Sequence, residues 1–162
     1  MSDNIKNRQI VIMGNSGSGK TTLARKIASQ YSLPVLDLDT LAWLDTVPPE
    51  RKNITDSKRE MTQFMELNQQ WIVEGCYADL LEIACIFGNE LIFLNPGVAQ
   101  CVANCKRRPW EPNKYKTAKE QDENLAMLIN WVEQYSIRKD EFSLHSHQLV
   151  FENFSGKKTE IN

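Results

Sequence analysis

A glycine-rich segment near the start of the chain has the residue pattern of a phosphate-binding loop. The pattern's glycines let the backbone fold tightly, so that N–H groups and the N-terminus of the next helix face a phosphate. Lys20 would place its charge on the β and γ phosphates, and Thr21 would offer a hydroxyl to Mg²⁺. The pattern predicts binding of a nucleoside triphosphate, with ATP and Mg²⁺ as the expected cofactors, through Gly14, Asn15, Ser16, Gly17, Ser18, Gly19, Lys20, Thr21 and Thr22.

Acidic residues that close two later apolar runs could complete a phosphotransfer site. Asp37 and Asp39 are two apart, so they would share a face of a regular strand. Glu74 ends the run 71–73, in the layout of a Walker B carboxylate. Ligands of parallel sheets bind at the carboxyl ends of the strands, where these groups would meet. We expect Asp39 to orient or deprotonate an acceptor hydroxyl, Asp37 to contact the acceptor, and Glu74 to bind the metal with Thr21. Each of them could instead be a cap or turn residue.

Cations are concentrated in residues 106–118, which we call the basic segment. In a chain of net charge −2 this concentration is informative. Guanidinium groups on a loop can neutralise a phosphoryl group in transfer, so Arg107 and Arg108 are candidate catalytic residues. The segment could also be a solvated basic loop. Trp110 and Tyr115 could stack on a base or anchor the loop, and Arg138 is a further candidate cation.

Aromatic residues follow both acidic strand ends. Trp43 comes shortly after Asp39, and Gly75 and Tyr77 come directly after Glu74. These three could line an acceptor pocket, although an aromatic residue beside a strand end can equally belong to the core.

The elements that must position these residues follow from periodicity and turn signals. Short β-branched runs predict strands, and apolar residues at helical spacing predict helices. Strands are expected at 9–13, 35–39, 71–74, 91–94 and 158–161, and helices at 21–31, 57–69, 98–107, 118–141 and 143–154. Residues 45–56 and 108–117 are expected to be loops. This alternation predicts an α/β fold of three layers, α/β/α, around a parallel sheet of about five strands. We expect one domain over residues 1–162, with the basic segment as a lid.

Composition excludes several classes of function. The chain has 162 residues, 41% of them apolar and 25% charged, which is ordinary for a globular protein. The net charge does not favour nucleic acid or an anionic membrane, and no run approaches the roughly 18 apolar residues of a membrane span. The polar N-terminus lacks a secretory signal, so a cytoplasmic location is expected. Four cysteines are expected to be reduced thiols, although Cys101 and Cys105 could instead bind zinc.

Taken together, these segments resemble the small P-loop kinases related to adenylate and shikimate kinases. The resemblance is greatest to adenylate-kinase-like proteins often labelled DNA topology modulation proteins, and it covers residues 9–108. It implies a five-stranded parallel sheet, a lid over the phosphates that carries Arg107 and Arg108, and transfer of the γ-phosphoryl group to a small acceptor near Asp39. The chain departs from relatives that carry Asp-Gly-Asn-Tyr, because it has Glu74-Gly75-Cys76-Tyr77 there. The acceptor-recognising residues of true adenylate kinases are not evident, which argues against AMP as the acceptor.

The leading hypothesis is therefore an ATP-dependent small-molecule kinase, with the acceptor and the base preference open. The acceptor could be a nucleoside, a nucleotide or another hydroxy compound. The second hypothesis is a nucleotide-binding regulator with little or no kinase activity, whose partner surface would be the long amphipathic helix predicted at 118–141. A second copy of the chain, in a homodimer, is a candidate partner. Nucleic-acid binding through residues 106–119 is the weakest hypothesis.

Overall fold

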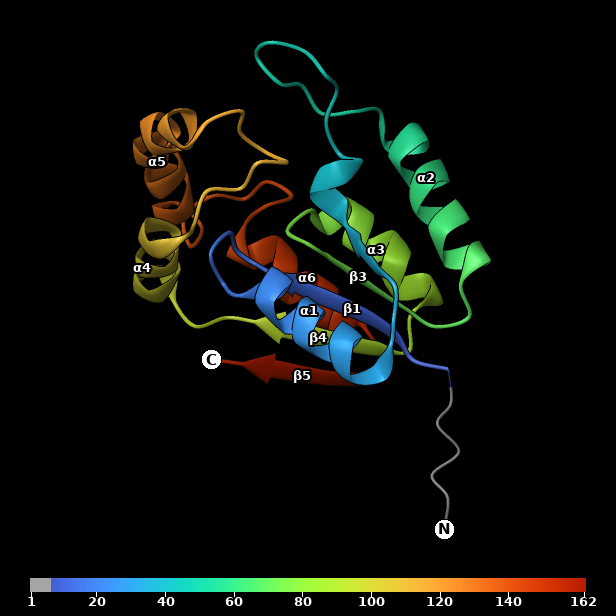
Figure 1. Cartoon of the computed structure of the whole chain (residues 1–162). Helices are drawn as coiled ribbons and strands as arrows, with labels where there is room; N and C mark the ends of the chain where they lie inside the picture. Colours follow the sequence, from blue (N-terminus) through green and yellow to red (C-terminus); the bar gives the residue numbers. More distant parts are fainter. Residues whose placement is uncertain (1–6) are drawn as a thin grey trace.

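Five parallel strands form the centre of the computed structural model, which describes residues 7–162. Figure 1 shows them between layers of helices, as predicted. Their order across the sheet is β2-β3-β1-β4-β5, so β1 lies in the middle. The strands are β1 Gln9–Gly14, β2 Val35–Asp37, β3 Trp71–Gly75, β4 Glu90–Leu94 and β5 Lys157–Ile161.

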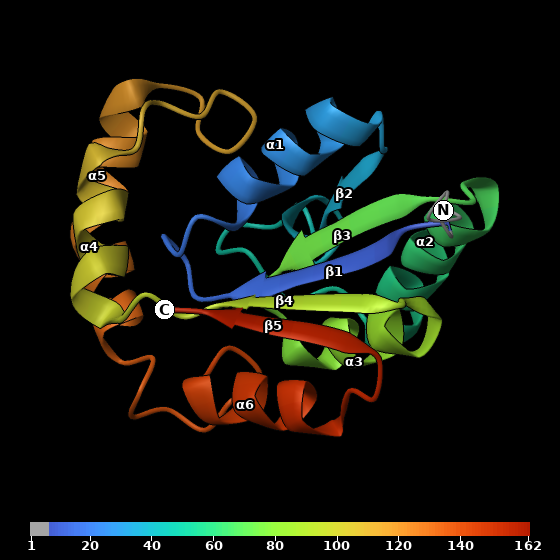
Figure 2. The ribbon, with the colours of Figure 1, turned by 90° about the horizontal axis from the view of Figure 1, so that it is seen from below.

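Helices cover both faces of the sheet, which explains why the central strands are apolar along their whole length. Ile10 and Ile12 of β1 pack toward α1, whereas Val11 and Met13 pack in the larger core beneath α2, α3 and α6. Figure 2 shows the strands pointing toward α4 and α5, which lie beyond their carboxyl ends. The helices are α1 Lys20–Tyr31, α2 Ile54–Leu67, α3 Ala78–Phe87, α4 Val98–Arg107, α5 Ala118–Glu133 and α6 Leu144–Asn153.

Two predicted elements end earlier than their periodicity indicates. The predicted strand 35–39 stops at Asp37, and Leu38–Thr40 form a 3₁₀ turn that begins when the Asp37 carboxylate accepts the Asp39 N–H at 2.9 Å. Asp37 and Asp39 therefore do not share a strand face, because that hydrogen bond turns the backbone away from the sheet. The residues on which the predicted acceptor site depends thus lie on a turn.

The predicted helix 118–141 was also too long, because α5 ends at Glu133. The chain then turns, and the Leu144 N–H returns to the carbonyl of Tyr135 at 2.9 Å. This turn brings Glu141 to the start of α3, where its carbonyl accepts the Ala78 N–H at 2.9 Å. A continued helix would carry Glu141 away from that contact.

The sequence patterns did not predict one of the helices. Residues 78–87 form α3, whose apolar residues occupy most of its circumference and leave no polar stripe to reveal a helical period. It packs between α2 and α6 on the larger core. None of the helices between residues 7 and 162 combines the length and apolarity that a bilayer-spanning helix needs.

The buried His147 joins three distant parts of the chain. Its Nε2 lies 2.7 Å from the carbonyl oxygen of Cys76, and its Nδ1 lies 2.7 Å from the hydroxyl of Tyr135. A neutral ring satisfies both contacts by donating to the carbonyl and accepting from the hydroxyl. Burial, together with the charges of Lys20 and Arg138, lowers the pKa of His147 to about 4 despite the opposing bond to Cys76.

The first prediction concerns stability at acid pH. Between the ordinary histidine pKa of about 6.5 and the folded-state pKa of about 4, the unfolded chain binds a proton that the folded chain does not. The contribution of His147 to the free energy of unfolding should therefore be lost as pH falls through this window, by roughly 3 kcal/mol. In urea unfolding, the free energy of unfolding should fall less between pH 7.5 and pH 4 in His147→Gln than in the wild type. The exposed His145→Gln should follow the wild type, and equal slopes in all three proteins would contradict the assignment.

Candidate functional site

The phosphate-binding loop lies between the end of β1 and the start of α1, at the carboxyl edge of the sheet. Gly17 and Gly19 adopt φ values of 79° and 97°, which L-residues with side chains rarely adopt. A Cβ atom on Gly17 would lie 2.4 Å from the carbonyl oxygen of Cys101 in α4. In addition, Asn104 of α4 donates from Nδ2 to the Gly17 carbonyl at 2.8 Å. The loop is therefore held against α4 at a distance that only glycine allows.

Lys20 folds back over this loop, and its Nζ donates to the carbonyl of Asn15 at 2.8 Å. Asn15 itself is buried, and its Nδ2 donates to the carbonyl of Val132 in α5 at 3.4 Å. The lysine charge is thus positioned at the mouth of the loop, where a phosphate would bind.

A cavity of about 860 Å³ opens in front of the loop. This volume lies within the usual range for small-molecule sites. Its lining includes Trp110 and a single carboxylate, that of Glu111. Its cations come from the loop, from α1 and from the basic segment: Lys20, Arg25, Lys26, Arg107, Arg108 and Lys114. Such a charge distribution suits a polyanion.

Glu74 lies at the end of β3, next to the start of α1. Its Oε1 accepts the hydroxyl of Thr21 at 3.1 Å, and the residue is 2% exposed. Burial raises the pKa of Glu74 to about 7, and the charges of Asp37 and Asp39 add to this rise, against the opposing effects of Lys20 and Thr21. The structure therefore brings together the two side chains predicted to bind metal.

The oxygen pair of Thr21 and Glu74 fits Mg²⁺. This ion takes oxygen ligands, keeps several waters and needs only one or two protein groups beside substrate phosphates. Between residues 7 and 162 no group of three or more histidine, cysteine or acidic side chains is placed so that it could hold a metal ion by itself. The ion would reduce the negative charge of the phosphates beside Lys20.

Asp39 lies at the centre of a hydrogen-bonded chain of side chains. Its Oδ1 accepts the hydroxyl of Tyr77 at 2.5 Å, and its Oδ2 accepts Nζ of Lys114 at 2.8 Å. The Tyr77 hydroxyl in turn accepts the indole N–H of Trp43 at 2.8 Å. Burial opposes ionisation of Asp39, but Lys114 and the Tyr77 hydroxyl outweigh it and lower the pKa of this carboxyl. Asp39 is therefore ionised at neutral pH.

The remaining predicted acceptor residues lie close by. Asp37 pairs with Glu74 across the parallel strands β2 and β3. Its pKa is raised, first by burial and then by the charge of Asp39. Gly75 leaves no room for a side chain, because a Cβ atom there would lie 2.9 Å from the Leu38 side chain. The residues predicted for the acceptor side are thus brought together in space, and their roles stay predictions.

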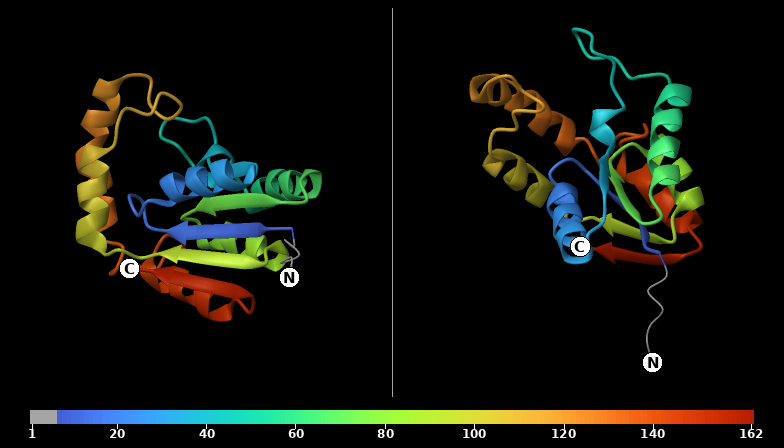
Figure 3. Two further views of the ribbon diagram at one scale, coloured as in Figure 1. Left: turned by 60° about the horizontal axis from the view of Figure 1, so that its bottom comes forward. Right: turned by 45° about the vertical axis from the view of Figure 1, so that its right-hand side comes forward.

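The basic segment supplies a contact that the sequence did not single out. Figure 3 shows the chain between α4 and α5 reaching across to the segment after β2, where Lys114 binds Asp39. Arg107 and Arg108 line the cavity but make only local contacts, with Asn104 at 3.3 Å and with Glu111 at 3.8 Å. No local sequence pattern marked Lys114 as a partner of Asp39, because Asp39 lies 75 positions earlier in the chain.

The sequence left the roles of three further side chains undecided, and the structure gives each of them a defined position. Tyr115 anchors the basic segment, since its hydroxyl accepts Nδ2 of Asn124 in α5 at 2.8 Å, whereas Trp110 borders the cavity. Arg138 stacks on Trp131, with its Cζ 4.1 Å from the ring centroid, and it does not line the cavity.

The cysteines are free thiols, as expected. Cys101 and Cys105 are buried against Val132 of α5. Burial raises the pKa of Cys101 to about 11. Within residues 7–162 neither thiol belongs to a group of three or more histidine, cysteine or acidic residues that could hold a metal ion, so the structure does not support zinc binding by this pair, which packs α4 against α5.

Comparisons with known proteins agree with this geometry. A family described as "AAA domain" matches residues 10–128. The comparison with curated proteins finds no match. An unliganded sugar kinase from Janibacter sp. HTCC2649 is similar in structure, with a TM-score of 0.55 and 15% identity over 96% of this chain and 84% of that one. A deoxyadenosine kinase from M. mycoides, with bound dATP, has a TM-score of 0.50 and 12% identity over 95% and 90%. At these identities the likeness shows the fold, and the predicted P-loop kinase fold is confirmed.

The second prediction tests the contact between the loop and α4. Gly17→Ala would combine a positive φ with a Cβ atom too close to a backbone oxygen. It should lower the free energy of unfolding by roughly 3 kcal/mol. Gly19→Ala is the matched control, since it also has a positive φ but has nothing within 4 Å of the added atom. Its cost should be about 1 kcal/mol, from backbone strain alone. Equal losses in chemical denaturation would show that α4 does not press on the loop.

Proposed function

The chain belongs to the AAA-domain family, matched over residues 10–128, and on this premise we propose that it is a kinase. It transfers the γ-phosphoryl group of ATP, with Mg²⁺, to the hydroxyl of a small acceptor. The observation that carries this proposal is the position of Lys114, which lines the cation-rich cavity and also binds Asp39 at 2.8 Å. A phosphate site and a carboxylate suited to an acceptor hydroxyl are therefore adjacent.

On the donor side, the loop from Gly14 to Thr22 binds the phosphates through its N–H groups. Lys20 neutralises charge on the β and γ phosphates, and Thr21 with Glu74 holds the metal. Catalysis of phosphoryl transfer depends mainly on such positioning and charge neutralisation. The support for these roles is the cation-lined cavity and the bond between Thr21 and Glu74.

On the acceptor side, Asp39 orients the acceptor hydroxyl and receives its proton as the oxygen bonds to the γ-phosphorus. The bond between that phosphorus and the β–γ bridging oxygen breaks, and ADP leaves. Because both Asp39 oxygens already have donors, the acceptor must replace Lys114 or share an oxygen with it. Trp43, Gly75 and Tyr77 border this position, and Tyr77 keeps Asp39 in place.

The basic segment, in this proposal, is the lid of a single domain over residues 1–162. Arg107 and Arg108 face the phosphates from the end of α4, and Lys114 links the lid to the acceptor side. Release of Lys114 from Asp39 would open the site to the acceptor.

The hypothesis of a nucleotide-binding regulator has lost the feature that favoured it. That hypothesis needed a free apolar face on the helix predicted at 118–141. In the shorter α5, Leu125, Leu128 and Val132 pack with Cys101 and Cys105 of α4. Part of that face is therefore packed within the chain, with Val132 buried and Leu125 and Leu128 partly buried.

The third prediction concerns Lys20. Lys20→Ala should lower acceptor-dependent ADP formation by at least about 100-fold, because it removes charge stabilisation from the transferring group. Thermal unfolding should show a folded protein. Lys58→Ala, which removes an exposed lysine from α2, is the charge-matched control and should keep full activity. Undiminished turnover in Lys20→Ala would mean that the loop does not bind the triphosphate. If no nucleoside, nucleotide or other hydroxy compound stimulates ADP formation in the wild type, the kinase proposal fails.

The fourth prediction concerns pH and Glu74. A metal ligand must be ionised, and the pKa of Glu74 is about 7. The affinity for Mg·ATP should therefore rise with pH up to about 7, by roughly tenfold per unit on the acid side, and then level off. Calorimetric titration from pH 5.5 to 8.5 would measure this. Glu74→Gln should bind more weakly and keep only the pH dependence of the nucleotide itself. If the affinity for Mg·ATP depended on pH in the same way in the wild type and in Glu74→Gln, the proposal that Glu74 binds the metal would be contradicted.

A further inference from the structure

The acceptor side of the site carries the opposite charge from the donor side. Asp37 and Asp39 lie at and just after the end of β2, within electrostatic reach of one another, and Asp37 is paired in the strand register with Glu74, the residue proposed to hold the metal. The donor cavity, in contrast, is lined by six cationic side chains and one carboxylate. The boundary between these regions lies at Lys20 and Lys114.

Both lysines at the boundary already have bonding partners within the chain. Lys20 belongs to the phosphate-binding loop, where it donates to the Asn15 carbonyl. Lys114 pairs with Asp39 at 2.8 Å and lies 3.8 Å from Glu111. Lys20 and Lys114 are the cations that act on Asp37 and Asp39, and movement of the basic segment would leave only Lys20, whose charge also serves the donor phosphates.

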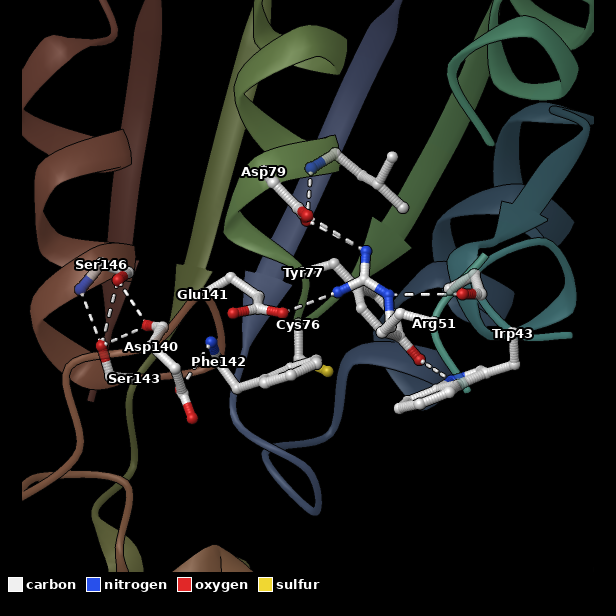
Figure 4. Close-up of polar contacts among 12 residues, drawn as sticks. Trp43, Arg51, Cys76, Tyr77, Asp79, Asp140, Glu141, Phe142, Ser143 and Ser146 are labelled. Atoms are coloured by element: carbon white, nitrogen blue, oxygen red, sulfur yellow. Dashed lines mark hydrogen bonds and ion pairs between the residues drawn. The ribbon is translucent and has the colours of Figure 1, made fainter. Parts of the chain in front are cut away.

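Arg51 is a further cation near the acceptor side, and its guanidinium group is fully engaged. Figure 4 shows it between Asp79 and Glu141, beside Tyr77 and Trp43. Nη2 lies 3.1 Å from Asp79, and Nη1 lies 2.9 Å from Glu141. Its Nε donates to the Ala42 carbonyl at 3.3 Å, and its Cζ lies 4.8 Å from the Tyr77 ring centroid. All three nitrogens of Arg51 have partners, so it fastens the loop after Trp43 without offering a free charge to a ligand.

Arg138 is engaged less completely, because its Nε and Nη2 are buried and form no hydrogen bond with any atom of residues 7–162. Its Nε lies 3.3 Å from Asp140, and its Nη1 donates to the Trp131 carbonyl at 3.3 Å. The stack on Trp131 covers one face of its guanidinium group. Phe142 lies between this arginine and Tyr77, with its ring 5.3 Å from the tyrosine ring.

We infer that the acceptor is a hydroxy compound that carries no phosphate or carboxylate group. An anionic group beside Asp37 and Asp39 would be repelled by both carboxylates and would have to compete with Asp39 for Lys114, the cation already paired there. Hydroxyl groups can instead donate to these carboxylates. Trp43, which is 39% exposed, adds an apolar face beside them. This inference rests on the proposed kinase function and names its substrate class, which excludes nucleoside monophosphates and sugar acids.

A binding experiment can test the inference apart from catalysis. The whole protein would be saturated with Mg²⁺ and a non-hydrolysable ATP analogue, so that anions cannot bind on the donor side. Calorimetry would then compare compounds that differ by one anionic group: adenosine with AMP, ribose with ribose 5-phosphate, and glucose with gluconate. In any pair that binds, the uncharged member should bind at least tenfold more tightly. Tighter binding of the anionic member would overturn the inference. Binding of the uncharged member without ADP formation from ATP would leave the inference standing and contradict the kinase proposal.

A second measurement, fluorescence quenching by charged ions, reports the sign of the local charge and does not require the acceptor to be known. In a Trp110→Phe background, Trp43 is the most exposed tryptophan. After each quencher is normalised to its effect on free N-acetyltryptophanamide, caesium ions should quench the fluorescence of Trp43 more strongly than iodide does, and Trp43→Phe in the same background should remove the difference. Asp37→Asn should reduce the ratio of caesium to iodide quenching severalfold, with the fold checked by thermal unfolding. Glu66→Gln, at the exposed end of α2, is the charge-matched control and should leave the ratio unchanged. Stronger quenching by iodide would overturn the inference whatever the ligand panel shows.

Discussion

The hydrogen bond between Thr21 and the buried Glu74 joins the two halves of the site. It links the start of α1 to the end of β3, two elements far apart in the chain that the pairing of β1 with β3 brings to one edge. Parallel strands covered on both faces have to present their polar residues at the carboxyl edge, because the sheet interior offers no partners for them. A buried carboxylate at that edge needs either a proton or a cation. Burial is accordingly the main cause of the raised pKa of Glu74.

Opposite charges on the two sides of this edge follow from which elements supply them. The cations come from α1 and the basic segment, whereas the carboxylates come from the ends of β2 and β3 and the turn after β2. Lys114 crosses between the sides and lowers the pKa of Asp39, while Asp37 and Glu74, which form no ion pair of this kind, have raised pKa values. One ion pair thus divides three neighbouring carboxyl groups into one that stays ionised and two that are protonated more easily.

The C-terminal third of the chain forms the support behind the acceptor side. Phe142 packs on Tyr77, Glu141 binds Arg51, and His147 binds the carbonyl of Cys76. These contacts converge on the turn after β3, which carries the tyrosine that holds Asp39. In this way the segment after α5 and helix α6, which have no recognisable site motif, help to fix the position of Asp39, the proposed acceptor carboxylate.

The local pattern of the sequence determined the phosphate-binding loop, the five strands and most helices. Those features depend on residues close together in the chain, such as the glycines before Lys20 or the apolar run before Glu74. Other features were decided only by tertiary structure. The helix α5 ends early because residues 134–143 pack on the turn after β3, whereas Asp39 leaves the strand through a local bond to Asp37 that strand periodicity does not report. Lys114 and Arg51 obtained their partners from positions far away in the chain. Periodicity and motifs report on neighbours in sequence, whereas ion pairs between distant loops exist only once the sheet has brought those loops to the same edge.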